Sequence, residues 1–90
     1  MLAEAMAWEL GRYGIRVNCV APGIVDTPLN ADYLVDDEAR SRAAAMVPLG
    51  RVAEPVDIAD VVAFLASSSS RYVTGVTVRT DGGMRLGWTP

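Results

Sequence analysis

The residues best placed to do chemistry directly follow the first expected strand, in the segment Pro22-Gly23-Ile24-Val25-Asp26-Thr27. Open α/β sheets bind ligands beyond the carboxyl ends of their strands. Gly23 lets the backbone approach a ligand closely, and the hydroxyl of Thr27 is able to donate a hydrogen bond. A strand followed by Pro-Gly is also a common turn, so a ligand-binding loop and a plain turn are both open at this point.

Three consecutive acidic residues, Asp36, Asp37 and Glu38, are the second group that invites a chemical interpretation. Carboxylates bind metal ions, but three in a row at the start of a helix point in different directions. The chain also contains no histidine. A helix cap at Asp36 or Asp37 is therefore the preferred interpretation, and no metal site is predicted.

The apolar spacing predicts the elements that position these groups. Leu2, Met6 and Leu10 recur every four residues, which is typical of a helix that is apolar on most sides and needs neighbours all round. It starts without a capping side chain, and Gly11 and Gly14 are expected to end it. Further along the chain we expect a strand over 15–21 that Pro22 stops, a loop over 22–36, helices over 38–46 and 55–65, a strand over 76–79 and a turn at 81–83.

The separation of the two expected strands predicts how they pair. More than 50 residues lie between them, which excludes a tight hairpin and favours one parallel pair with a right-handed helical crossover. Parallel sheets are normally covered on both faces, so two strands alone leave a deficit. Exposing Leu2, Met6, Trp8 and Leu10 would forfeit about 1.5 to 3 kcal/mol each.

Composition excludes several classes of protein. The net charge is 8 − 11 = −3 and all eight positive residues are arginines scattered along the chain, so nucleic-acid binding is not predicted. No apolar run approaches the roughly 18 residues of a membrane helix, and the N-terminal segment lacks the positive start of a signal peptide. We expect no membrane association and a cytoplasmic location.

Cys19 is the single cysteine, which we interpret as a small core residue.

Several short motifs between residues 3 and 84 occur in the order and at the spacings found in one family. The motifs are Ala7-Trp8-Glu9-Leu10, Ile15-Arg16-Val17-Asn18, Pro22-Gly23 with Thr27, Gly50-Arg51 with Pro55, Ile58-Ala59, Phe64-Leu65-Ala66-Ser67, and Val73-Thr74-Gly75 leading to Asp81-Gly82-Gly83. Each motif is weak alone, but together they are specific. On these residues the chain resembles the C-terminal part of the classical short-chain dehydrogenase/reductases.

The resemblance implies an α/β fold, the C-terminal portion of a Rossmann-like doubly wound parallel sheet, with residues 1–90 as a single partial domain. It implies hydride transfer between NAD or NADP and a carbonyl or alcohol. Pro22 and Gly23 would pack by the nicotinamide, the Val25 backbone would hold its carboxamide, and the Thr27 hydroxyl would reach the carboxamide or pyrophosphate. Residues 28–47 would be the substrate lid, and its candidate substrate contacts are Leu29, Tyr33, Leu34 and Met46. Packing within the lid is the equal alternative for these side chains.

The catalytic part of that family has no counterpart here. Its Tyr-x-x-x-Lys pair is missing, since Tyr13, Tyr33 and Tyr72 are followed four positions later by other residues and the chain has no lysine. No Gly-x-Gly phosphate loop occurs either. We therefore expect the chain to be inactive alone, unable to hold the cofactor without a missing N-terminal nucleotide-binding half, and to start at what is an internal methionine of its relatives. Neither the substrate nor the choice between NAD and NADP is predicted.

Three hypotheses follow for the molecule as a whole. The first is a partial or truncated chain, the C-terminal segment of an NAD(P)-dependent short-chain oxidoreductase. The second is an oligomerisation or binding module that pairs with full-length relatives, or with itself, through the last helix and the edge strand. The third is one half of a split enzyme. Two further residues have expected structural roles: Asn18 ties neighbouring loops together, and Arg51 pairs with a carboxylate to anchor the lid.

Overall fold

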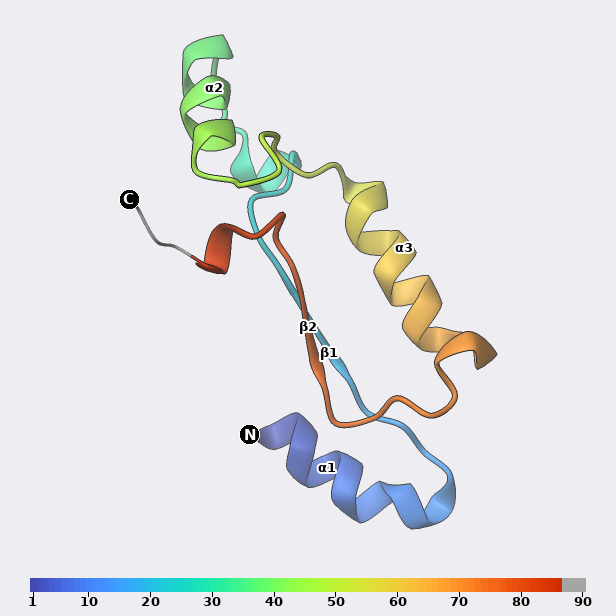
Figure 1. Cartoon of the computed structure of the whole chain (residues 1–90). Coiled ribbons are helices and arrows are strands. Elements are labelled where there is room, and N and C mark those ends of the chain that lie inside the picture. Colours follow the sequence, from blue (N-terminus) through green and yellow to red (C-terminus); the bar gives the residue numbers. More distant parts are fainter. Residues whose placement is uncertain (87–90) are drawn as a thin grey trace.

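The computed structural model describes residues 1–86 and places one pair of strands between helices at either end (Figure 1). The helices are α1 (Leu2–Leu10), α2 (Asp37–Ala45) and α3 (Pro55–Ala66), the strands are β1 (Cys19–Pro22) and β2 (Thr77–Thr80), and the short 3-10 helices are η1 (Gly11–Tyr13), η2 (Pro28–Asn30), η3 (Ser68–Ser70) and η4 (Met84–Leu86). The radius of gyration is 15.8 Å, above the roughly 12 Å of a compact domain of this length.

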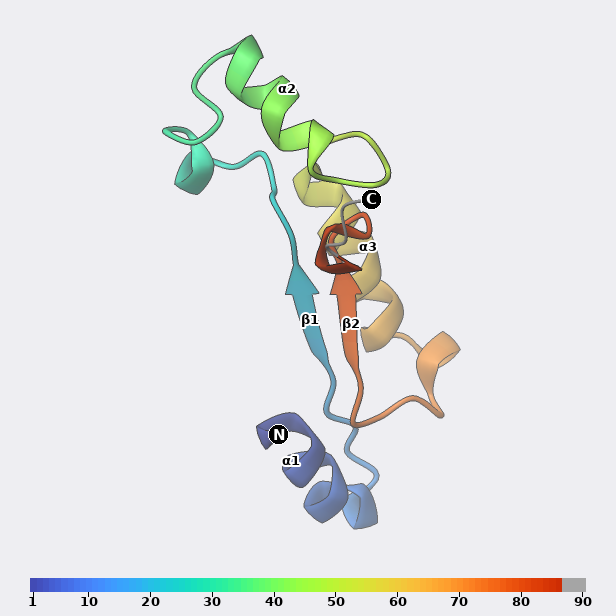
Figure 2. The ribbon, with the colours of Figure 1, turned by 60° about the vertical axis from the view of Figure 1, so that its left-hand side comes forward.

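The two strands pair in parallel, with Cys19 opposite Thr77 and Pro22 opposite Thr80. The crossover between them contains η2, α2, α3 and η3, and α3 contacts both strands from one side (Figure 2). This confirms the predicted parallel pair with a helical crossover. The interpretation of Cys19 as a core residue is wrong, because its side chain is exposed. No described element covers it, since α3 shields the pair from one side.

Strand β1 is shorter and later than the predicted strand over 15–21. The preceding residues are held to the chain before β2 by a mixture of bonds: the Val17 carbonyl accepts from the Gly75 amide at 2.8 Å, and Thr74 Oγ1 accepts from the Val17 amide at 3.0 Å. Asn18 donates to the Val73 carbonyl at 3.1 Å and accepts from the Val76 amide at 3.2 Å. The predicted role of Asn18 in tying two loops together is confirmed.

Helix ends follow the predicted signals. Asp36 caps α2, and its Oδ1 accepts from the Ala39 amide at 2.8 Å, so the acidic run begins a helix. Met1 makes no side-chain cap at α1. Gly14 has φ +74°, which favours glycine because a side chain would be strained there, and ends the turn after α1.

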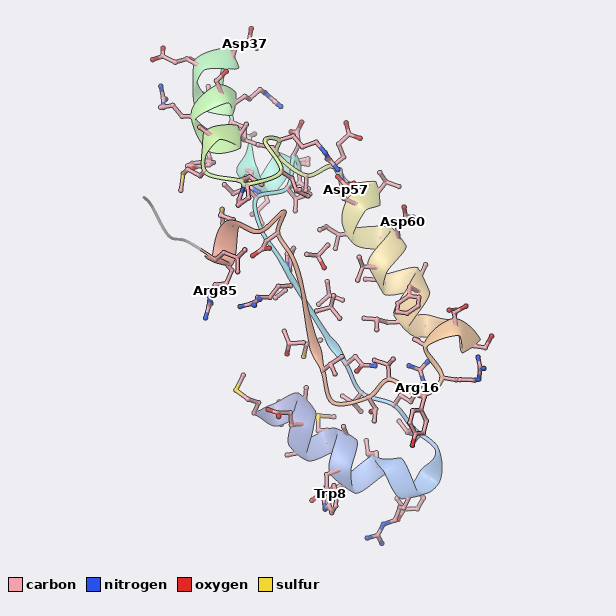
Figure 3. All side chains as sticks on the ribbon, in the orientation of Figure 1. Trp8, Arg16, Asp37, Asp57, Asp60 and Arg85 are labelled. Atoms are coloured by element: carbon pink, nitrogen blue, oxygen red, sulfur yellow. The ribbon has the colours of Figure 1, made fainter. Side chains whose placement is uncertain are left out.

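Arg16 joins the start of the sheet to the end of α3. Its guanidinium donates to the carbonyls of Leu65, Ser67 and Val73 at 2.9 to 3.3 Å and to Ser70 Oγ at 3.2 Å. The last carbonyls of a helix lack partners within it and carry partial negative charge, so a cation stabilises them. Arg16 therefore positions α3 relative to β1 (Figure 3).

The buried apolar residues lie mostly in the lid region, as Val25, Leu34, Ala39, Ala43 and Val47. In α1 only Ala7 is buried, and its Cβ lies close to Gly75. Trp8 points away from the strands in Figure 3 and is 88% exposed. Within residues 1–86 the apolar faces of α1 thus lack the neighbours that their sequence pattern predicts.

Candidate functional site

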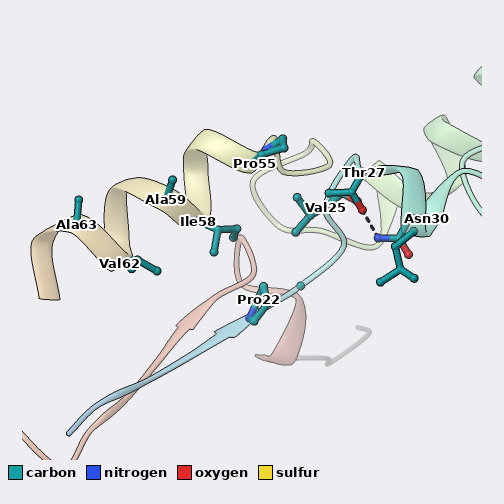
Figure 4. A pocket seen from close by; sticks show the side chains of 11 residues that line it. Pro22, Val25, Thr27, Asn30, Pro55, Ile58, Ala59, Val62 and Ala63 are labelled. Atoms are coloured by element: carbon teal, nitrogen blue, oxygen red, sulfur yellow. Dashed lines mark hydrogen bonds between the residues drawn. The ribbon is translucent and has the colours of Figure 1, made fainter. Parts of the chain in front are cut away.

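An apolar hollow of about 690 Å³ opens between the end of β1 and helix α3, and we call it the α3 hollow. Its lining is Pro22, Gly23, Val25, Thr27, Leu29, Asn30, Pro55, Ile58, Ala59, Val62 and Ala63. Figure 4 shows the labelled members of this set on the strand end, the loop that follows it and α3. The four residues predicted to contact a cofactor are therefore neighbours in one concave site, in the size range of small-molecule pockets.

The backbone around Val25 is fixed by a second parallel bridge, to Ala53. The Asp26 amide donates to the Ala53 carbonyl at 2.8 Å, and the Ala53 amide donates to the Ile24 carbonyl at 3.0 Å. In such a bridge the groups of Val25 itself point to the opposite side. There the Val25 carbonyl accepts from Asn30 Nδ2 at 2.7 Å and keeps a second lone pair. The amide and the carbonyl of Val25 therefore offer one donor and one acceptor on the side away from Ala53.

Gly23 is required by packing within the chain. A Cβ at this position would lie 2.8 Å from Cβ and 3.0 Å from Cα of Asp81, so any larger residue would push β1 away from the turn after β2. The sequence suggested close approach of a ligand. The structure supplies a different neighbour, the Asp81 backbone, and the ligand contact remains a prediction.

Thr27 precedes η2 but does not cap it with its side chain. Its hydroxyl therefore stays available to a ligand in the α3 hollow. Leu29, a predicted lid contact, lines the same hollow and is 92% exposed. Such an exposed leucine beside a concave site offers apolar surface to whatever fills it.

The other three predicted lid residues separate into two environments. Tyr33 and Met46 line a second hollow of about 450 Å³ together with Pro22, Gly23, Ile24, Asn30 and Met84, and we call it the lid hollow. Tyr33 Oη lies 3.8 Å from Met46 Sδ. Leu34 is 3% exposed and belongs to the core of the lid, so a substrate contact by Leu34 stays a prediction. Met84 was not predicted, because it lies beyond the second strand, far from the lid in sequence.

An ion pair that the sequence did not predict fixes α2 to the loop after β1. Arg40 donates to both carboxylate oxygens of Asp26, at 2.8 and 3.2 Å. The hydrogen bond from Arg40 holds the pKa of Asp26 below its usual value. Because Asp26 stands between Val25 and Thr27, this two-pronged contact, which we call the Asp26 fork, places the lid helix relative to the candidate cofactor contacts.

A second fork joins the loop after the lid to α3. Arg51 donates to both oxygens of Asp57, at 2.7 and 3.0 Å, and Asp57 also accepts from the Glu54 amide at 2.8 Å. These bonds, the one from Arg51 first, lower the pKa of Asp57 to about 2. The predicted pairing of Arg51 with a carboxylate is confirmed. Its position in the first turn of α3 also makes Asp57 part of a capping box with Glu54.

The α3 hollow contains no acid–base pair among the residues described. None of the three tyrosines lines it, and the chain has neither lysine nor histidine. Within residues 1–86, histidine, cysteine and acidic side chains form no cluster suited to a metal ion. None of the described helices is long and apolar enough to cross a membrane.

Comparisons with known proteins agree along nearly the whole chain. A family profile described as enoyl-(acyl carrier protein) reductase matches residues 1–85. The chain is 46% identical over 86 residues to 3beta-hydroxysteroid dehydrogenase 1 of Eggerthella lenta. The aligned residues are 96% of this chain but only 33% of that protein. It is 48% identical over 83 residues to L-rhamnose 1-dehydrogenase (NAD(P)(+)) of Azotobacter vinelandii. That alignment includes 92% of this chain and 32% of the relative.

Solved structures give the same result. A 4-hydroxyisoleucine dehydrogenase complexed with NADH superposes with a TM-score of 0.89 at 32% identity, covering 97% of this chain and 36% of the other. Gluconate 5-dehydrogenase from Burkholderia cenocepacia, in complex with NADP and tartrate, gives a TM-score of 0.87 at 33% identity, covering 98% of this chain and 34% of the other. The chain thus spans about a third of the length of the relatives it matches.

Proposed function

Because this chain belongs to the short-chain dehydrogenase/reductase family and matches its C-terminal segment, we propose that it forms the cofactor wall and substrate lid of an NAD(P)-dependent oxidoreductase. The reaction is hydride transfer between a nicotinamide and a carbonyl or alcohol. One observation carries the proposal: Pro22, Gly23, Val25 and Thr27 line one hollow at the carboxyl end of a parallel strand, where α/β sheets bind nucleotides.

Each of these residues has a part that its geometry allows. Pro22 and Gly23 give the nicotinamide ring a flat apolar wall, and the amide and carbonyl of Val25 match the donor and acceptor of its carboxamide. The free hydroxyl of Thr27 donates to the carboxamide or to the pyrophosphate. The bound nicotinamide supplies the hydride chemistry, and the chain's contribution is to fix which face of the ring meets the substrate.

The general acid–base pair has to come from another segment. The chain covers about a third of its relatives and has no lysine, so we propose that a nucleotide-binding portion supplies the catalytic groups and most of the cofactor contacts. That portion belongs either to the same polypeptide or to a separate one. The exposed apolar side chains of α1, among them Leu2 and Trp8 at 77% and 88% exposure, are the surface that such a portion would cover.

The first test uses the native polypeptide that carries this sequence, captured with an antibody against residues 81–90. We expect an intact mass about three times the 9.6 kDa of this chain and oxidation of alcohols that depends on NAD or NADP. In that protein, Thr27→Val removes one hydroxyl and should weaken cofactor binding about 3- to 10-fold, the usual effect of one lost hydrogen bond. Fluorescence titration of NADH and NADPH measures it.

The matched control is Thr77→Val, the same substitution at an exposed position in β2. Its cofactor affinity should equal that of the unmodified protein. Equal effects of the two substitutions would contradict the assignment of Thr27. A native product that binds neither NADH nor NADPH would overturn the proposed function itself.

A second proposal concerns assembly. The outer face of α3 leaves Val56 and Phe64 about half exposed, and within the described chain β2 has a single strand neighbour, β1. We propose that α3 and β2 form a contact between two copies of the protein. Size-exclusion chromatography with light scattering should give a dimer or tetramer, and Phe64→Glu should shift it to a smaller species. A monomer at micromolar concentration would contradict this proposal.

A further inference from the structure

The lid hollow lies on the other side of the strand end from α3. Figure 4 shows α3 and the helix after β2 on opposite sides of β1. Both hollows share Pro22, Gly23 and Asn30, so a ring packed on the Pro22–Gly23 wall of the α3 hollow borders the lid hollow directly. The lid hollow is therefore the described space next to the proposed hydride transfer.

The walls of the lid hollow are held in place by contacts within the chain. Tyr33 follows η2, where its amide donates to the Asn30 carbonyl at 3.1 Å. Met46 is the C-cap of α2, and its amide donates to the Ala43 carbonyl at 3.1 Å. Met84 begins η4, which Asp81 fixes by accepting from the amides of Gly83 and Arg85 at 3.0 and 2.9 Å. The shape of the hollow thus comes from three anchored segments.

The chemistry of this lining is apolar and neutral. Ile24, Tyr33, Met46 and Met84 provide most of its side-chain surface, and no charged side chain of residues 1–86 lines it. Two polar side chains belong to the lining: Asn30 donates one N–H to the Val25 carbonyl, and the Tyr33 hydroxyl lies 3.8 Å from Met46 Sδ. A carboxylate or polyol placed here would lose its hydration without gaining enough hydrogen bonds.

The two methionines suit an apolar ligand of variable shape. Met46 is 57% and Tyr33 51% exposed, so each presents apolar surface to the hollow at a cost that a ligand would recover. Methionine is unbranched and polarisable, and it adapts to irregular apolar groups. The volume of about 450 Å³ accommodates a medium alkyl chain or a fused alicyclic ring.

We propose that the lid hollow binds the apolar part of the substrate, an alkyl or alicyclic group attached to the reacting alcohol or carbonyl carbon, and that Met84 is a specificity-determining residue. This inference rests on the proposed function for the identity of the reacting group. It adds the substrate class, an apolar secondary alcohol or ketone, and a contact from beyond the lid.

The direct test is binding, without turnover. The native protein is labelled with ¹³C at the methionine methyl groups, and the Met46 and Met84 signals are assigned with Met46→Leu and Met84→Leu variants. Titration with 2-octanol should shift both signals together and to saturation, while sorbitol at the same concentration should not. Met6 on α1 is the internal control. No shift, or an equal shift at Met6, would overturn the proposal, because it would indicate general apolar binding.

The kinetic test measures kcat/KM for NAD(P)-dependent oxidation along the series 2-butanol, 2-pentanol, 2-hexanol and 2-octanol. Burial of each added methylene should raise kcat/KM about fourfold. Met84→Asp should remove this dependence on chain length without changing the KM for the cofactor, and Met84→Leu should restore it. Leu86→Asp, an exposed position in the same short helix that does not line the hollow, should leave the dependence intact.

The outcomes separate the two proposals. A rate that does not depend on alkyl length, or a polyol as the preferred substrate, overturns the apolar substrate class while the oxidoreductase assignment stands. Absence of any NAD(P)-dependent turnover overturns the proposed function, and the methyl shifts then still decide whether the lid hollow binds apolar alcohols.

Discussion

The two ends of the strand pair differ in how far the chain satisfies its own groups. At the carboxyl end, which we call the lid end (residues 22–57), two arginine–aspartate forks and the Asp36 cap fix the loops to the helices. Five apolar side chains are buried there. At the other end, α1 buries only Ala7 and leaves Trp8 exposed. The lid end is closed by local contacts, whereas α1 depends on surface that the described chain does not supply.

This difference matches the division of roles that we propose. A lid that opens and closes over a substrate has to keep its own shape, so its core and ion pairs are internal. Helix α1, by contrast, has apolar residues on most sides, which is typical of a helix buried between layers. The comparison therefore predicts that substitutions at the lid end act in any form of the protein, and that those on α1 act only when another segment covers it.

In the 90-residue chain the largest expected effect comes from Leu34→Ala. It removes a side chain that is 3% exposed and should lower the free energy of unfolding by about 2–4 kcal/mol. Trp8→Ala should change it by less than about 0.5 kcal/mol in the 90-residue chain, and by about 3–5 kcal/mol in a longer protein that covers α1. Urea unfolding of both variants measures the contrast. A large loss for Trp8→Ala in the 90-residue chain would contradict the comparison.

Gly82→Ala tests the turn that joins β2 to the lid. Gly82 has φ +62°, and an added Cβ would lie 2.5 Å from the Cγ1 of the buried Val47. Left-handed strain and overpacking together should cost about 2–3 kcal/mol. The control is Gly11→Ala, where φ is −57° and nothing lies within 4 Å, so unfolding should be unchanged or slightly harder. Thermal unfolding compares the two, and equal shifts would rule out this explanation.

Arg16→Met removes the cation that binds the end of α3 while keeping an apolar stem. The carbonyls of Leu65 and Ser67 then lose their charged donor, and the free energy of unfolding should fall by about 1.5–3 kcal/mol. Arg12→Met, at an exposed position in η1, should have an effect below about 0.5 kcal/mol. Hydrogen exchange should also speed up at the last turn of α3 in the Arg16 variant alone.

The smallest expected effect is the pH dependence of the fork at Asp57. Folding lowers the pKa of Asp57 from 3.8 to about 2, so its contribution to stability is complete above pH 4 and is lost as the pH falls toward 2. Asp57→Asn should reduce the loss of stability between pH 4 and 2, and Asp60→Asn, on the same helix, should not. Unfolding midpoints at pH 7, 4 and 2.5 check this. Equal pH profiles for the two variants would contradict it.

The sequence predicted features that depend on neighbours along the chain. The Asp36 cap, the glycine-rich turn at 81–83 and the helices follow from residues within a few positions of one another, and the parallel pairing follows from the long separation of the strands. The sequence also singled out Pro22–Thr27, because these residues are contiguous and follow a strand. Four of them line one hollow, and their cofactor contacts stay a prediction.

The features that sequence reasoning missed depend on the path of the loops. Arg40 meets Asp26 across 14 residues, and Met84 reaches the lid hollow from beyond β2, so neither contact has a local pattern. Cys19 was predicted to be buried because its strand is apolar. Burial of a parallel strand needs layers on both faces, and the composition of the strand alone does not supply them.

The long separation within the sheet also sets the order in which the protein folds during synthesis. Cys19 pairs with Thr77, which is 77 − 19 = 58 residues later. At roughly 5–20 residues per second, β1 is synthesised about 3–12 seconds before its partner strand. Throughout that interval the edge of β1 that later pairs with β2 is open, and an open strand edge is a site of aggregation. The lid end, with its local core and forks, is able to form first, so the nascent chain offers its folded lid before its sheet and needs protection chiefly at β1 and α1.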